Sequence, residues 1–196
     1  MIKLLTQSIR QTIVWTVFTG LLYPLVITVI AQLAFPRQAN GSLLQRDGKL
    51  VGSELIAQQF QGPTYFWPRP SAAGYGTGAS GIAGSSGSNL GPTSAQLQTN
   101  VRANAKALRD AHKLPADAPV PADLVHASAS GLDPHISPEA ARFQISRVAA
   151  ARGMSGEAVT KLVEKFIEPP QWGFLGEARV NVLRLNLALD EADIKK

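Results

Sequence analysis

The feature that most constrains this chain is a run from Gln11 to Pro36 that contains no charged side chain. Within it, residues 13–35 read IVWTVFTGLLYPLVITVIAQLAF. The hydrocarbon core of a bilayer, about 30 Å thick, is crossed by roughly 20 apolar residues in a helix that rises about 1.5 Å per residue. We therefore predict one transmembrane helix over residues 11–35. Because a single helix cannot enclose a transport path, any transport by such a chain requires other subunits.

A cleaved signal peptide is the main alternative, because Lys3 and Arg10 form a basic leader. The apolar segments of signal peptides are about 7–15 residues long and end at an A-x-A-like cleavage site. The run here is longer, and its end at residues 31–35 (AQLAF) lacks small residues at both required positions. These features favour an anchor that is retained.

Basic residues near a membrane span set its orientation, since flanks rich in Lys and Arg stay in the cytoplasm. Lys3, Arg10 and the amino terminus precede the span, and Arg37 follows it. We predict that residues 1–10 are cytoplasmic and that residues 36–196 lie outside the cytoplasm. In a bacterium this makes a single-pass protein of the inner membrane with a periplasmic domain. The absence of cysteine fits that compartment and excludes a disulfide scaffold.

The predicted span has polar and helix-distorting residues of its own. Pro24 lacks a backbone donor and its ring crowds the carbonyl of Gly20, so we expect the helix to bend there. Hydroxyl side chains on one face suit close packing on a partner helix, although a threonine can also bond back to its own helix. The residues that recur at helical spacing on this face are Thr12, Thr16, Thr19 and Tyr23.

The formal charge of +5 suggests a nucleic-acid-binding protein, but the distribution of charge argues against that class. Three of the 19 Lys and Arg residues flank the span, which leaves 16 against 14 Asp and Glu in the rest of the chain. A nearly neutral domain lacks the basic footprint of nucleic-acid binding. In the later helices, basic residues including Arg147 and Arg152 alternate with acidic ones, and we interpret them as solvated helix faces.

The domain after the span mixes short strand and helix patterns without regular alternation, which predicts an α+β fold. The first expected elements are a hairpin over 43–51 with a type I′ turn at Asp47-Gly48, a helix over 53–60 and a strand over 65–67. Further helices are expected from a cap at Thr93 or Ser94 to about His112, over 137–152 and over 155–166. Residues 179–189 are expected to form either a bulged strand or a strand that passes into a helix.

Residues 72–92 are very rich in Gly and Ser, as in a flexible linker or a long ordered loop. The position of this stretch between two structured segments favours a loop that is ordered by itself or by a partner. A phosphate-binding loop requires the pattern G-x-x-x-x-G-K-[ST]. The one Gly-Lys pair, Gly48-Lys49, lies in the predicted hairpin and is followed by Leu50, so nucleotide binding by the glycine-rich stretch is disfavoured.

Two further sets of residues suggest chemistry. Ser130, Asp133 and His135 are the residue types of a hydrolase, so a membrane-anchored periplasmic hydrolase is the alternative function. Catalytic triads normally gather from separate segments, and turns with a helix start explain these residues better. His112, His126 and His135 match no zinc spacing. We assign no catalytic residue, no metal ligand and no cofactor-binding residue.

The segments taken together resemble the C subunit of the bacterial Kdp potassium-transporting P-type ATPase. Each block alone is weak, but their order along nearly the whole chain is specific. The blocks are the N-terminal anchor, GSELI at 52–56, YFWPRPS at 65–71, GSNLGP at 87–92, SGLDPHI at 130–136, RVA at 147–149, RVNVL at 179–183 and LNLAL at 185–189. Ser86 departs from the glycine that the family is expected to have there.

The resemblance implies a non-catalytic subunit of a high-affinity potassium importer, needed for assembly. Its companions would be a channel-like potassium-binding subunit, a P-type ATPase subunit and a small single-helix subunit. The family is also described as a catalytic chaperone that raises the affinity of the ATPase subunit for ATP. A periplasmic domain favours an indirect effect over direct contact with ATP, although both remain open, and a binding domain on a passive anchor is a third option. Candidates for contact with partners in the domain are Tyr65, Arg69, Ser88, Asn89, Ser130, Asp133 and His135.

Overall fold

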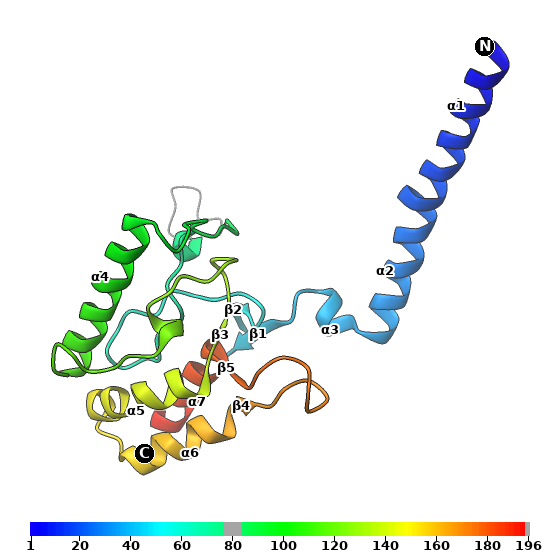
Figure 1. The fold of residues 1–196 in the computed structure, drawn as a ribbon. Helices are drawn as coiled ribbons and strands as arrows, with labels where there is room; N and C mark the ends of the chain where they lie inside the picture. The colour runs from blue at the N-terminus through cyan, green and yellow to red at the C-terminus, as the bar shows by residue number, and fades with distance from the viewer. Residues whose placement is uncertain (77–83, 195–196) are drawn as a thin grey trace. The chain divides into compact units, whose positions relative to one another are not determined.

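The computed structural model describes residues 1–76 and 84–194 and divides the chain into two compact units, Met1–Ser53 and Glu54–Lys196 (Figure 1). The first unit contains the apolar helix and a hairpin, and the second mixes helices with short antiparallel strands. The prediction of an α+β domain with one N-terminal helix is confirmed. Residues 77–83 of the glycine-rich stretch lie outside the described residues.

The apolar segment forms one uninterrupted helix made of α1 (Ile2–Val17), the π-helical turn η1 (Phe18–Leu22) and α2 (Tyr23–Ala34). It has 33 residues with a mean hydropathy of 2.1 in its apolar window, and no residue of that window is buried. At about 1.5 Å per residue the helix is about 50 Å long, which exceeds a hydrocarbon core of about 30 Å. The helix is therefore long and apolar enough to cross a membrane, and it starts earlier than the predicted span of 11–35.

The π-helical turn lies immediately before Pro24, where the sequence predicts a distortion. The backbone N–H of Tyr23 donates to the carbonyl of Phe18, five residues back instead of four. Pro24 has no N–H to give to the carbonyl of Gly20, and its ring would crowd that carbonyl in a regular helix. The widened turn relieves this crowding and keeps the helix continuous.

A short helix, α3 (Pro36–Ala39), leads into a two-stranded antiparallel hairpin of β1 (Leu43–Arg46) and β2 (Lys49–Ser53). The turn residues Asp47 and Gly48 have φ angles of 52° and 72°. A type I′ turn needs positive φ at both central positions, and glycine and aspartate reach that region readily. The predicted hairpin is confirmed.

In the second unit, helices pack against a small antiparallel sheet of strand order β3 (His135–Ile136), β5 (Arg179–Asn181) and β4 (Ile167–Glu168) (Figure 1). The helices are α4 (Ala95–His112), α5 (Pro138–Arg152), α6 (Gly156–Lys165) and α7 (Val182–Ile194), with the short 3-10 turns η2 (Gly74–Gly76) and η3 (Ala122–Leu124). The core holds fully buried side chains from three of these helices, from β5 and from the segment before η2, including Val148, Val159, Val163, Val180, Leu185, Leu189 and Phe66. Each such side chain contributes about 1.5–3 kcal/mol.

The predicted helix starts are confirmed by their side-chain caps. Ser94, Ser137 and Ser155 each accept a hydrogen bond from the backbone N–H three residues later, at the starts of α4, α5 and α6. A serine hydroxyl in this position satisfies one of the donors that a helix start leaves free. Over residues 179–189 the second alternative is correct, because β5 passes directly into α7.

Two short predicted elements are wrong. No helix follows Ser53: residues 54–56 form a turn and residues 57–60 are irregular. The Ser53 hydroxyl donates to the carbonyl of Gly41 (2.7 Å) rather than capping a helix, and the N–H of Ala57 donates to the carbonyl of Leu132 (3.0 Å). Residues 65–67 form no strand, because side chains rather than another strand bind their backbone.

The described end of the glycine-rich stretch packs against the turn at residues 128–131. The N–H of Ser86 donates to the carbonyl of Ser130 at 2.9 Å. Gly131 has a φ of 69°, and a Cβ at this position would lie 2.5 Å from the Ser86 carbonyl oxygen. Gly87 makes a similar close approach, since a Cβ there would lie 2.7 Å from the Ala129 carbonyl oxygen. The two backbones therefore approach as closely as glycine alone permits.

Candidate functional site

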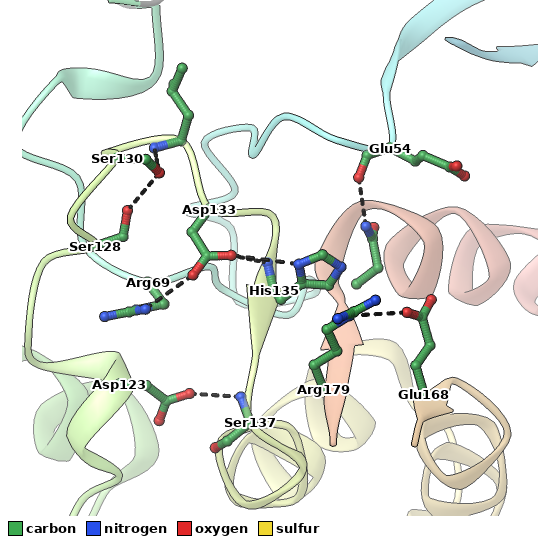
Figure 2. A network of polar contacts seen from close by, with 12 residues as sticks. Glu54, Arg69, Asp123, Ser128, Ser130, Asp133, His135, Ser137, Glu168 and Arg179 are labelled. Carbon is green, nitrogen blue, oxygen red and sulfur yellow. Dashed lines mark hydrogen bonds and ion pairs between the residues drawn. The ribbon is translucent and has the colours of Figure 1, made fainter. Parts of the chain in front are cut away.

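Two of the predicted residues, His135 and Arg69, lie against Asp133, whereas Ser130 makes its contacts elsewhere in the turn (Figure 2). One carboxylate oxygen of Asp133 pairs with Nη1 of Arg69 at 3.0 Å. The other accepts the backbone N–H of His135 at 3.0 Å and lies 3.6 Å from Nδ1 of that ring. Partial burial alone would raise the pKa of Asp133, but hydrogen bonds from His135 and Arg69 lower it below its usual value. Asp133 is thus a charged centre that joins two segments distant in sequence.

Arg69, the other partner of this carboxylate, lies two residues after the segment 65–67 that was predicted to be a strand. Its carbonyl accepts a hydrogen bond from the hydroxyl of Tyr75. Burial, followed by the nearby charge of Asp133, raises the pKa of Tyr75 to about 12, so the hydroxyl stays protonated as a donor. Nε of Arg69 is buried and has no hydrogen-bond partner among the described residues. The carboxylate with which Arg69 pairs, that of Asp133, belongs to the same chain.

Ser130 does not complete a hydrolytic arrangement with these residues. Its hydroxyl accepts the N–H of Leu132 at 3.1 Å and lies 3.3 Å from the hydroxyl of Ser128. The hydrogen bonds of the described residues include none between Ser130 and His135, the contact that a serine nucleophile requires. These hydroxyls instead stabilise a turn, as the alternative interpretation of the sequence holds.

A polar depression of about 310 Å³ lies beside Asp133 and its partners Arg69 and His135. Its walls include Arg69, Asp123, Asp133, His135 and Arg179, so charges of both signs face it (Figure 2). Asp123 is occupied in accepting the backbone N–H of Ser137 at 2.7 Å. Within residues 1–76 and 84–194 there is no group of three or more His, Asp or Glu side chains that could hold a metal ion.

The backbone of residues 63–67 is held by side chains of α5 and α7, which sequence reasoning missed. Asn186 accepts the N–H of Phe66 at 2.8 Å and donates to its carbonyl at 2.9 Å. Gln144 does the same for Trp67, at 2.8 and 3.2 Å. Two amide side chains thus replace a neighbouring strand. The signal in the sequence is a polar residue on the apolar face of a helix, as Gln144 is on α5.

Arg147 extends this arrangement, although the sequence placed it on a solvated face. It is 8% exposed and donates to the carbonyls of Pro63 (2.7 Å) and Tyr65 (3.0 Å). Desolvation lowers its pKa to about 10, so it stays charged at neutral pH. Its Nε donates to Nε2 of His112 at 3.2 Å, and burial with the charge of Arg147 lowers the pKa of His112 to about 4. His112 is therefore neutral and acts as an acceptor.

Arg152, also predicted to be solvated, joins the same segment to the C-terminal helix. It pairs with Asp190 and Asp193 of α7, each at 2.7 Å, and its Nε donates to the carbonyl of Thr64 at 2.6 Å. Its guanidinium carbon lies 4.8 Å from the centre of the Tyr65 ring. Tyr65 is half-buried, and its ring is in contact with Arg152 of the same chain.

The other candidates for partner contact are exposed. Ser88 and Asn89 lie in the loop before α4, where Asn89 has a φ of 53°. Thr12, Thr16, Thr19 and Tyr23 all lie on the exposed surface of the long helix. The Thr19 hydroxyl donates to the carbonyl of Trp15 at 2.7 Å, so this residue bonds back to its own helix.

Comparison with known proteins gives the family. The family model described as KdpC: K+-transporting ATPase, c chain, matches residues 5–191. The chain belongs to the KdpC family. Curated KdpC relatives named "Potassium-transporting ATPase KdpC subunit" match it over nearly their whole length. The relative from Methylococcus capsulatus is 53% identical over 97% of this chain and 98% of its own. The relative from Geobacter sulfurreducens is 54% identical over 96% and 97%, and that from Rhodospirillum rubrum is 51% identical over 97% of each chain.

The family assignment confirms the resemblance read from the ordered blocks of sequence. The family name, a subunit of a potassium-transporting ATPase, and the single apolar N-terminal helix both fit a membrane-anchored chain. Three of the blocks lie at positions where the structure is tightly constrained. Residues 65–71 are held by α5 and α7, residues 130–136 surround Asp133, and residues 87–92 begin at the close approach of Gly87.

Proposed function

We propose that this chain is the non-catalytic C subunit of an ATP-driven, high-affinity potassium importer in the bacterial inner membrane. The observation that carries the proposal is the KdpC family match over residues 5–191, together with relatives more than half identical that are named as ATPase subunits. The geometry of the described residues supports a structural role, because Ser130, Asp133 and His135 are engaged in turns and an ion pair.

The proposed partners are the channel-like potassium-binding subunit, the P-type ATPase subunit and the small single-helix subunit. In this proposal the amino terminus is cytoplasmic, the long helix crosses the membrane once, and the α+β domain is periplasmic. The basic residues Lys3 and Arg10 before the span support this orientation. The helix face of Thr12, Thr16, Thr19 and Tyr23 packs on a companion helix, and the domain docks on the potassium-translocating subunit near its outer entrance.

In this proposal the chain raises the ATP affinity of the ATPase subunit indirectly. A periplasmic domain is separated from cytoplasmic ATP by the bilayer, so the effect would travel through the anchor and the companion subunits. Direct contact with ATP is the less favoured alternative. The sequence supports this ranking, since it contains no phosphate-binding loop pattern.

The test is to purify the complex from bacterial membranes with and without this chain and to measure potassium-stimulated ATP hydrolysis against ATP concentration. We expect loss of assembly without the chain or, where a complex persists, a higher KM for ATP. Unchanged assembly with an unchanged KM would refute the subunit role. Protease accessibility in sealed vesicles tests the orientation, and replacement of residues 2–34 by an unrelated span tests the passive-anchor option, which predicts no loss of function.

The hydrolase alternative receives no support from the geometry around Ser130. It predicts that His135→Ala abolishes turnover of an ester or peptide substrate while complex assembly stays intact. The proposed role predicts no such turnover in the first place.

A further inference from the structure

The loop between β4 and β5 presents large apolar side chains to solvent. It projects from the sheet edge of the second unit (Figure 1). Trp172 is 79% exposed, Phe174 is 74% exposed and Leu175 is 44% exposed. All other Trp, Phe and Tyr side chains of the described residues after Ser53 are buried or half-buried. Exposed aromatic side chains gathered in one place are typical of interaction sites rather than of ordinary surface.

This loop, residues 169–178, has a fixed shape. Gln171 and Leu175 exchange two backbone hydrogen bonds of 2.9 Å, and the N–H of Gly173 donates to the carbonyl of Pro170 at 2.9 Å. Trp172 itself has a φ of 55°, a conformation that L-residues adopt rarely, so the turn holds this side chain outward against a local strain. A preformed turn loses little entropy when it binds, which favours specific docking.

The base of the loop is fixed to the sheet. Glu168 on β4 pairs with Arg179 on β5 and with Arg184 on α7, each at 3.2 Å. The pair with Arg179 joins the strand that enters the loop to the strand that leaves it, and the pair with Arg184 joins the entering strand to α7. The aromatic tip is therefore carried on a defined support rather than on a free segment.

The charge of the loop indicates which kind of surface it fits. Between Pro169 and Ala178 there is no Lys or Arg, and the one charged residue is Glu177. Glu177 is exposed and makes no ion pair within the described part of the chain. Loops that insert into lipid normally use basic residues to meet phosphate groups, which a carboxylate repels. The combination fits a protein surface with an apolar pocket and a basic side chain at its rim.

We propose that residues 169–178 dock this subunit on a companion subunit of the ATPase, with Trp172 and Phe174 in an apolar pocket and Glu177 facing a basic group. This inference rests on the proposed function. It adds to it the segment of the domain that makes the contact and the chemistry of the surface that receives it.

Photo-crosslinking tests the contact directly in native membranes. Benzoylphenylalanine is placed at Phe174 of the full chain in the presence of all companion subunits, and the same probe at Leu114, another exposed apolar side chain, serves as the matched control. We expect an adduct with a companion polypeptide from position 174 and much less from position 114. An adduct with lipid only, or no adduct from position 174, would overturn the proposal.

Substitutions give an independent measure. Trp172→Ala with Phe174→Ala should lower retention of the companion subunits on the affinity-purified chain by about tenfold or more, since aromatic anchors dominate interface energies. Leu114→Ala should not change it, and the thermal unfolding of both variants should match that of the parent. Glu177→Lys should also weaken retention, and the loss should be larger at low salt than at high salt. Retention equal to that of the parent in the Trp172/Phe174 variant would contradict the inference.

Removal of the whole chain separates the two proposals. If the companion subunits assemble and function normally without the chain, the proposed function itself fails. If the chain is required, but the loop variants retain the companion subunits as the parent does and position 174 gives no adduct, the subunit role stands. Only the docking role of the loop is then refuted.

Discussion

Replacement of Asn186 by Ala tests the conclusion that side chains of α5 and α7 take the place of a neighbouring strand. Asn186 is 1% exposed, and its side chain binds both the N–H and the carbonyl of Phe66. Phe66 is itself fully buried. Alanine would leave two buried backbone groups without partners. Each such group costs about 1–3 kcal/mol, so Asn186→Ala should lower the free energy of unfolding by about 2–6 kcal/mol.

The assay is denaturant unfolding and, in parallel, thermal unfolding of the full chain in detergent, both monitored by near-ultraviolet circular dichroism of the packed aromatic side chains. At about 2–4 °C for each kcal/mol, Tm should fall by at least about 4 °C. Asn100→Ala is the matched control, since Asn100 is an exposed asparagine on α4 that accepts a hydrogen bond from Gln96. That control should change the free energy of unfolding by less than about 0.5 kcal/mol. A loss below about 1 kcal/mol for Asn186→Ala would show that the backbone of Phe66 finds other partners, and the reasoning would be wrong.

Two further predictions concern the loop contact and the effect of pH. Gly131→Ala should destabilise the domain by more than Gly153→Ala in thermal unfolding. Both glycines have positive φ, 69° and 61°, but only at Gly131 would the new Cβ meet Ser86, at 2.5 Å. Equal losses would mean that the close approach contributes nothing. The pKa of His112 is lowered to about 4 in the folded protein, so below pH 6.5 the unfolded chain binds a proton that the folded chain does not. Stability should therefore decrease as pH falls from about 6.5 towards 4. His112→Gln, which keeps an acceptor for Arg147, should flatten this dependence of Tm on pH, and an unchanged slope would assign it to other groups.

Much of the local structure could be predicted from the sequence. The apolar run gave a long helix, Asp47-Gly48 gave a hairpin turn, and serines at three positions gave helix starts. These features depend on residues close together in the chain. The strands β3 and β4 were missed, because two residues are too few to show an alternating pattern.

The candidate site was predicted only in part. The ordered blocks indicated the family and drew attention to Arg69, Asp133 and His135, which the structure brings together. The partner of Arg69 could not be chosen from the sequence, since 64 residues separate it from Asp133. Arg147 was placed on a solvated face, because charged residues are rarely buried unless paired. Its partners are backbone carbonyls of a distant segment, which no local pattern reveals.

The sequence by itself determined the long helix with a distortion at Pro24, the hairpin, the capped helices and the family to which the chain belongs. These follow from backbone sterics, side-chain periodicity and short-range hydrogen bonds. Only the tertiary structure decided that residues 63–67 are held by Gln144, Asn186 and Arg147, and that Trp172 stands outward on a closed turn. The physical reason is that a buried backbone group must find a partner, and the fold selects that partner from whatever long-range packing brings near.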